Sequence, residues 1–120
     1  MRDLKANKII DAITADVEKN GINAEAIIPE LKKLRESALL EKDPLVTKVL
    51  RLCYEYLEEN DGAFDVEGQY EEDEEGNELP IEVEDKENFL YLLGLLKKSD
   101  NKYNREEIKD YRTSLKSSLY

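Results

Sequence analysis

The residues whose types and spacing come closest to a chemical site form one acidic run. Five consecutive carboxylates stand together: Glu71, Glu72, Asp73, Glu74 and Glu75. With Gly76 aligned on the glycine of an EF-hand calcium loop, alternate residues of the run fall at ligand positions and Glu82 falls at the bidentate last position. The match is incomplete, because glutamate stands where the loop needs its first aspartate and the flanking segments are strand-like. We therefore predict only weak cation binding, and a weak calcium-binding structural protein remains one alternative.

The residue types of the chain give little support to catalysis or to transition-metal binding. The chain has no histidine, the side chain that most often serves as a general base and as a transition-metal ligand. Its one cysteine, Cys53, cannot form a zinc cluster, and its place on an apolar helix face is typical of a small buried hydrophobe. We predict no catalytic residue, no metal site and no cofactor. A small metal-independent enzyme that uses carboxylates remains the second alternative.

The charge of the chain is concentrated in one segment. Sixteen of the 29 acidic residues lie between Glu55 and Glu87, and Lys86 is the only basic residue among them. This segment carries a net charge of −15, whereas the formal net charge of the whole chain is −11. Such a distribution favours either a negative recognition surface or a loop that only keeps the protein in solution.

A negative recognition surface predicts a basic protein partner, of the kind that a nuclease inhibitor, an immunity protein or an adaptor would bind. Charge would speed association, and aromatic anchors would hold the complex together. We therefore predict a non-enzymatic protein-interaction module. The expected partner-binding residues are two aromatic side chains and the five acids: Phe64, Tyr70, Glu71, Glu72, Asp73, Glu74 and Glu75. The same net charge opposes direct binding to nucleic acid or to an anionic membrane surface.

Length and composition predict one domain. A chain of 120 residues, 40% apolar and 39% charged, can form one core with a heavily charged exterior. We expect residues 1–120 to form a single helical domain, with residues 61–84 as an acidic loop or hairpin within it. No apolar run approaches the roughly 20 residues of a membrane span, and the N-terminal residues lack the apolar core of a secretory signal. With a single cysteine, these features predict a cytoplasmic protein, whose oligomeric state the sequence does not specify.

Apolar residues at three- and four-residue spacing predict five helices. We expect them over residues 3–20, 29–41, 44–60, 86–98 and 105–118. Pro29 favours a separate short turn over residues 24–28 before the second helix, while Asp43 and Pro44 form a strong start signal for the third. The third helix has the widest apolar surface and is predicted to be the central one.

Local signals also predict how the helices begin and meet. Asp85 is expected to cap the fourth helix, and a capping box beginning at Asn104 is expected to start the fifth. Gly94 is expected to mark a close helix crossing. Leu4 and Leu39 are counted with the apolar faces of the first and second helices.

The segment between the third and fourth helices has a different period. Apolar or small residues alternate with polar ones on both sides of a Gly-Asn turn: Phe64, Val66, Gly68 and Tyr70 before it, and Leu79, Ile81 and Val83 after it. This pattern predicts a β-hairpin with Pro80 at an edge, and a disordered acidic loop is the alternative. The predicted fold is all-α or mostly α, a small bundle of about five short helices with this acidic loop or hairpin inserted between the third and fourth.

Overall fold

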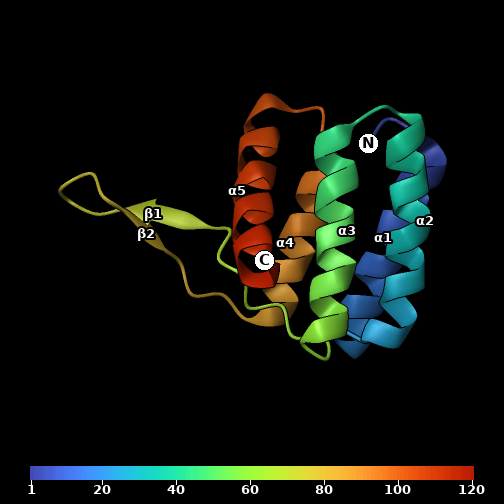
Figure 1. Cartoon of the computed structure of the whole chain (residues 1–120), viewed down its shortest axis with the longest axis horizontal. Coiled ribbons are helices and arrows are strands. Elements are labelled where there is room, and N and C mark those ends of the chain that lie inside the picture. Colours follow the sequence, from blue (N-terminus) through green and yellow to red (C-terminus); the bar gives the residue numbers. More distant parts are fainter.

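All 120 residues are described by the computed structural model, which forms five helices and one antiparallel pair of strands (Figure 1). The helices are α1 (Leu4–Asn20), α2 (Ala24–Leu40), α3 (Pro44–Glu59), α4 (Asp85–Lys97) and α5 (Lys102–Leu119), and the strands are β1 (Tyr70–Glu72) and β2 (Glu78–Pro80). The predicted mostly helical bundle with a β-hairpin between the third and fourth helices is confirmed. None of the helices combines the length and apolar character that crossing a membrane requires.

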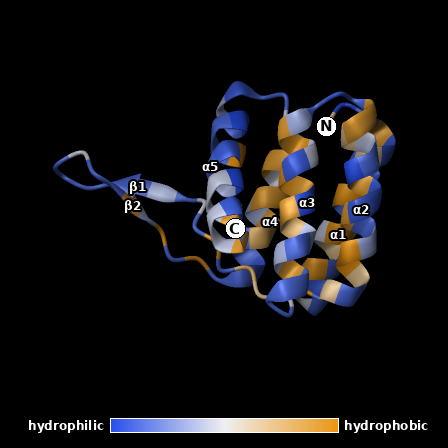
Figure 2. Ribbon diagram, in the orientation of Figure 1, coloured by the Kyte–Doolittle hydropathy of each residue, from blue (hydrophilic) through white to orange (hydrophobic).

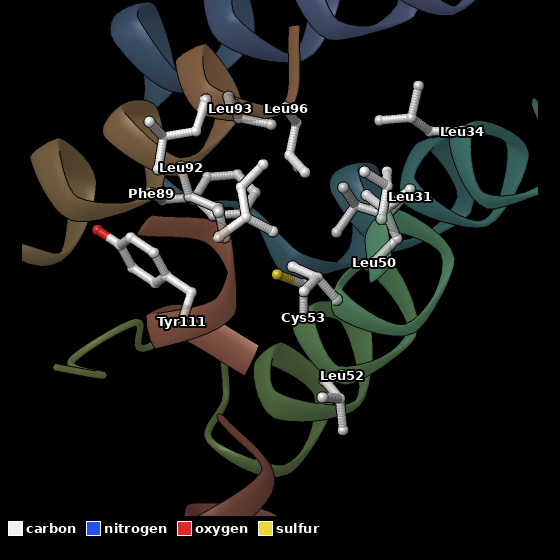
Figure 3. Packing of buried hydrophobic residues seen from close by; sticks show 14 of the residues in the cluster. Leu31, Leu34, Leu50, Leu52, Cys53, Phe89, Leu92, Leu93, Leu96 and Tyr111 are labelled. Carbon is white, nitrogen blue, oxygen red and sulfur yellow. The ribbon is translucent and has the colours of Figure 1, made fainter. Parts of the chain in front are cut away.

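The helices enclose one hydrophobic core (Figure 2), and the burial of its residues shows that α3 contributes most. Nine residues of α3 are buried, more than in any other element, and α3 packs most extensively against α2 and α5. Figure 3 shows Leu50 of α3 beside Leu31 of α2. Cys53 is fully buried, and burial raises the pKa of its thiol. The prediction of a central third helix and the interpretation of Cys53 as a small buried hydrophobe are confirmed.

The second helix differs from the prediction, because it begins at Ala24 instead of Pro29. Pro29 lies inside this helix, where it has no N–H to bond to the carbonyl four residues earlier. Ile27, Leu31 and Leu34 are all buried at four- and three-residue spacing, so the turn before the proline also enters the core. Tertiary packing of that first turn outweighs the local cost of the proline.

Three smaller expectations about the helices are also wrong. The side chain of Asn101, rather than Asn104, caps α5, because it accepts the N–H of Tyr103 at 2.9 Å. Gly94 is exposed, with nothing near the position of an added Cβ, so no helix crosses closely there. Leu4 and Leu39 are 78% and 52% exposed. Each lies one or two residues from a buried stripe, and about 100° of helical rotation per residue turns it toward solvent.

The carboxylate of Asp43 joins two helices that are far apart in sequence. It caps α3 by accepting the N–H of Val46 at 3.2 Å, as predicted. It also accepts two hydrogen bonds from the guanidinium of Arg105 in α5, with Nη1–Oδ2 at 2.9 Å and Nη2–Oδ1 at 3.1 Å. The Arg105 hydrogen bonds and the N–H of Val46 hold the pKa of Asp43 below its ordinary value, although partial burial opposes them.

Leu50→Asp should unfold the domain. It would place an unpaired carboxylate in the centre of the core, which costs several kcal/mol against a total stability of roughly 5–15 kcal/mol. Circular dichroism with thermal melting measures the effect. Glu72→Ala is the control, because Glu72 is exposed and makes no ion pair. Similar melting of the two variants would show that α3 is not the central helix.

Asp43→Asn should make the melting temperature depend less on pH in acid. The folded-state pKa of Asp43 lies below its unfolded value, so its contribution is complete above the unfolded pKa of about 3.9. That contribution is lost as the pH falls through the folded pKa. Asparagine still caps a helix but carries no charge to lose. Between about pH 6 and about pH 2, the melting temperature of the wild type should therefore fall further than that of Asp43→Asn. Equal losses would contradict the role of the Arg105 pair.

Candidate partner-binding hairpin

The candidate site is the connection between α3 and α4, residues 61–84, which we call the acidic excursion. Its central hairpin projects away from the helices, beyond α5 (Figure 1). The strands pair antiparallel with Tyr70 opposite Pro80, and the N–H of Ile81 donates to the carbonyl of Gln69 at 2.8 Å. Beyond this bond the two arms separate as they return to the bundle. The excursion is thus an ordered hairpin on two long arms, not a disordered loop.

The side chain of Asp73 holds the tip of the hairpin together. Its Oδ1 accepts the N–H of Glu75 at 2.9 Å and the N–H of Asn77 at 2.8 Å, and its own N–H donates to the Asn77 carbonyl. These hydrogen bonds, above all that from Asn77, lower the pKa of Asp73. Gly76 completes the turn at φ +82°, where glycine is favoured. Asp73 therefore shapes the turn that presents the neighbouring glutamates.

The negative charge of the excursion has no counter-charge within the protein. Residues 61–84 contain eleven acidic residues and no basic one, and none of them forms an ion pair. Lys86 lies two residues after the excursion, but its Nζ donates to the backbone carbonyl of Glu18 in the last turn of α1, at 2.8 Å. Every residue from 71 to 82 is exposed. The hairpin therefore carries an uncompensated negative potential into solvent.

Apolar side chains lie beside the acids on the second arm. Leu79 is 46% exposed and Ile81 is 40% exposed. Two residues apart in an extended chain, they face the same side. Figure 2 shows hydrophobic colour on this arm and a hydrophilic tip. Tyr70, expected as an aromatic anchor, is half-buried on the facing strand. Sequence reasoning missed Leu79 and Ile81 as binding residues, although their alternation with polar residues was the available signal.

Phe64 does not belong to the exposed surface, so its predicted role as a partner-contacting anchor is wrong. It is fully buried, with its ring centroid 5.2 Å from that of Phe89 and 6.3 Å from that of Tyr111. Its N–H donates to the carboxylate of Asp85 at 3.0 Å, so this carboxylate binds the excursion instead of capping α4. The aromatic packing makes the start of the excursion part of the core.

Asn88 of α4 fastens the first arm to the bundle. Its side-chain Nδ2 donates to the carbonyls of Phe64 at 3.0 Å and Val66 at 2.8 Å. Its Oδ1 accepts the hydroxyl of Tyr111 at 2.6 Å, and burial raises the pKa of that hydroxyl. Asn88 is only 3% exposed. Sequence reasoning missed it, although a polar residue four positions before the buried Leu92 was the available signal.

A cleft of about 610 Å³ separates the two arms at the base of the hairpin. Asn88 is one of the residues that line it. Four exposed carboxylates on the two arms also line it: Asp65, Glu67, Glu82 and Glu84. The cleft is therefore an open negative surface continuous with the hairpin. Its carboxylates are not enclosed by apolar side chains in the manner of a catalytic acid–base pair.

The structure gathers Tyr70 and the five predicted acids on one projecting element, and it separates Phe64 from them. No group of three or more cysteine, aspartate or glutamate side chains lies close enough together to hold a metal ion. Comparisons with protein-family models, curated proteins and solved structures found no match for the chain. The function must therefore be argued from this geometry.

Gly68→Ala should destabilise the anchoring of the hairpin. An added Cβ would overlap the ring of Tyr111, which is fully buried and has little room to move. We expect a loss of about 1–3 kcal/mol in urea unfolding. Gly94→Ala is the matched control, because its Cβ meets nothing and alanine should stabilise α4 by about 0.5–1 kcal/mol. Equal stability of the two variants would contradict the close packing of the first arm on Tyr111.

Proposed function

We propose that this protein is a non-enzymatic interaction module whose acidic hairpin binds a basic surface on another protein. The observation that carries the proposal is the set of eleven acids in the excursion with no ion pair among them. Elsewhere in the protein 18 acidic residues are matched by 18 basic ones, so the eleven acids of the excursion account for the whole net charge of −11. All eleven are exposed, and those of the hairpin lie on an element that extends away from the helices.

The hairpin has both parts that a binding surface needs. Glu71, Glu72, Glu74 and Glu75 supply a field that steers a basic partner, which raises the association rate. Leu79 and Ile81 supply apolar contact on one face of the hairpin, and Tyr70, which pairs with Pro80, supplies it on the other, and such contact slows dissociation. The first arm, anchored by Asn88, holds these groups in one geometry before binding, so less conformational entropy is lost in the complex. An inhibitor, an immunity protein or an adaptor would use such a surface.

The two alternative functions have weaker geometric support. A carboxylate enzyme needs a carboxyl group whose surroundings favour its protonated form, and the carboxylates of the cleft are all exposed. A calcium loop needs its carboxylates free to converge on one ion. Here the Asp73 carboxylate bonds instead to backbone N–H groups of its own turn, and strands flank the loop. Both features favour the binding module.

The test begins with capture of partners from native lysate on the whole protein. A variant with Glu71, Glu72, Glu74 and Glu75 changed to Gln removes four of the eleven negative charges and keeps Asp73, so the turn survives. The captured partner should bind this variant with an association rate lower by about tenfold or more at low salt. The wild-type rate should fall steeply as salt is added, and the variant rate should change little. Surface plasmon resonance across a salt series measures both.

A matched control separates local charge from net charge. Glu18→Gln, Glu25→Gln, Glu36→Gln and Asp100→Asn together remove the same four charges from exposed positions outside the excursion. This variant should bind nearly as fast as the wild type. If the control and the hairpin variant slow association equally, or if neither does, the hairpin is not the binding surface.

A further inference from the structure

A groove of about 450 Å³ lies between the end of α2 and the start of α3, and it is rich in positive charge. Four cationic side chains line it: Arg35, Lys42, Lys48 and Arg51. Leu39, 52% exposed, adds an apolar lip. In a chain of net charge −11, such a gathering of cations is unexpected on charge balance alone.

Most of these cations have no partner in the protein. Arg35, Lys42 and Lys48 form no ion pair and no side-chain hydrogen bond, and the buried Nε of Arg35 is left without an acceptor. Only Arg51 is engaged, with Glu55 at 3.2 Å. These unpaired cations give the groove a positive charge that a bound anion would neutralise.

The acids of the protein do not neutralise the groove. Asp43 is its one acidic lining residue, and both of its carboxylate oxygens are bound by Arg105. The acidic hairpin extends beyond α5, at the opposite end of the molecule from α2, along a long axis of 44 Å (Figure 1). Physiological salt screens charge over about 8 Å, so the hairpin field is weak at the groove. The two charged surfaces are therefore independent.

We propose that this groove binds a compact anion carrying two or more phosphate groups. Its volume is in the range of small-molecule sites, roughly 300–1,000 Å³. The planar donor fork of Arg35 matches phosphate oxygens. The ammonium groups of Lys42, in the turn between α2 and α3, and of Lys48, in α3, add point charges. Three unpaired cations carry more charge than the roughly −1.5 to −2 of one phosphate group at neutral pH, so a second phosphate group adds to the attraction. This site is separate from the hairpin and does not depend on its function.

Calorimetric titration with inorganic pyrophosphate, in the presence of a metal chelator, tests the proposal. The chelator prevents metal–pyrophosphate complexes from binding to the acidic hairpin. Pyrophosphate should bind at a single saturable site, at least about tenfold more tightly than inorganic phosphate, because it reaches more of the cations. The amide NMR signals of residues 35–51 should shift during the titration, and those of residues 70–80 should not.

Matched variants identify the groups responsible. Lys42→Gln with Lys48→Gln should weaken pyrophosphate binding by about tenfold or more, and Arg35→Lys should weaken it while preserving charge. Lys8→Gln with Lys116→Gln makes the same charge change at exposed positions on α1 and α5, and should change the dissociation constant by less than about twofold. Melting curves confirm that each variant is folded. Absence of saturable binding, equal affinity for phosphate and pyrophosphate, or equal weakening by the two double variants would overturn the proposal.

Discussion

The buried side chain of Asn88 is the group on which the arrangement of the excursion depends. Extended backbone entering a helical core brings carbonyl groups that helices cannot satisfy, and each one left unbonded costs about 1–3 kcal/mol. Asn88 bonds two such carbonyls, those of Phe64 and Val66, and also accepts the hydroxyl of Tyr111. A helix residue thereby takes the place of a neighbouring strand. The first arm can lie in the core, and the hairpin can project from a fixed base.

The helices were predictable because their stabilising interactions are mostly local or follow a simple period. The apolar stripes of α1, α3 and α5 predicted their buried faces, and the Asp43-Pro44 start of α3 was read from two adjacent residues. The errors arose where distant residues decide the outcome. Pro29 favoured a helix start, but burial of Ile27 against the rest of the core extends α2 past it. No local rule weighs those two effects against each other.

The candidate site was predicted in part, and the reason is the same. Exposure of a long acidic run follows from its composition, so the placement of Glu71 and its neighbours could be read from sequence. The alternation of apolar and polar residues through Phe64 and Val66 also corresponds to alternating burial in the structure. It describes a strand-like arm packed on helices, however, and not the hairpin itself, whose strands begin only at Tyr70. The basic groove could not be predicted because its cations come from two helices and the turn between them, at ordinary surface positions.

The hairpin also has a consequence for self-association. Its sheet has only two strands, so each of them is an edge with unpaired backbone groups, close to the exposed Leu79 and Ile81. Open edges of this kind template pairing with the same strand of another molecule and lead toward fibrils. Two such hairpins would have to bring their rows of glutamates face to face. The acids that would attract a basic partner therefore also keep copies of this chain from pairing with one another.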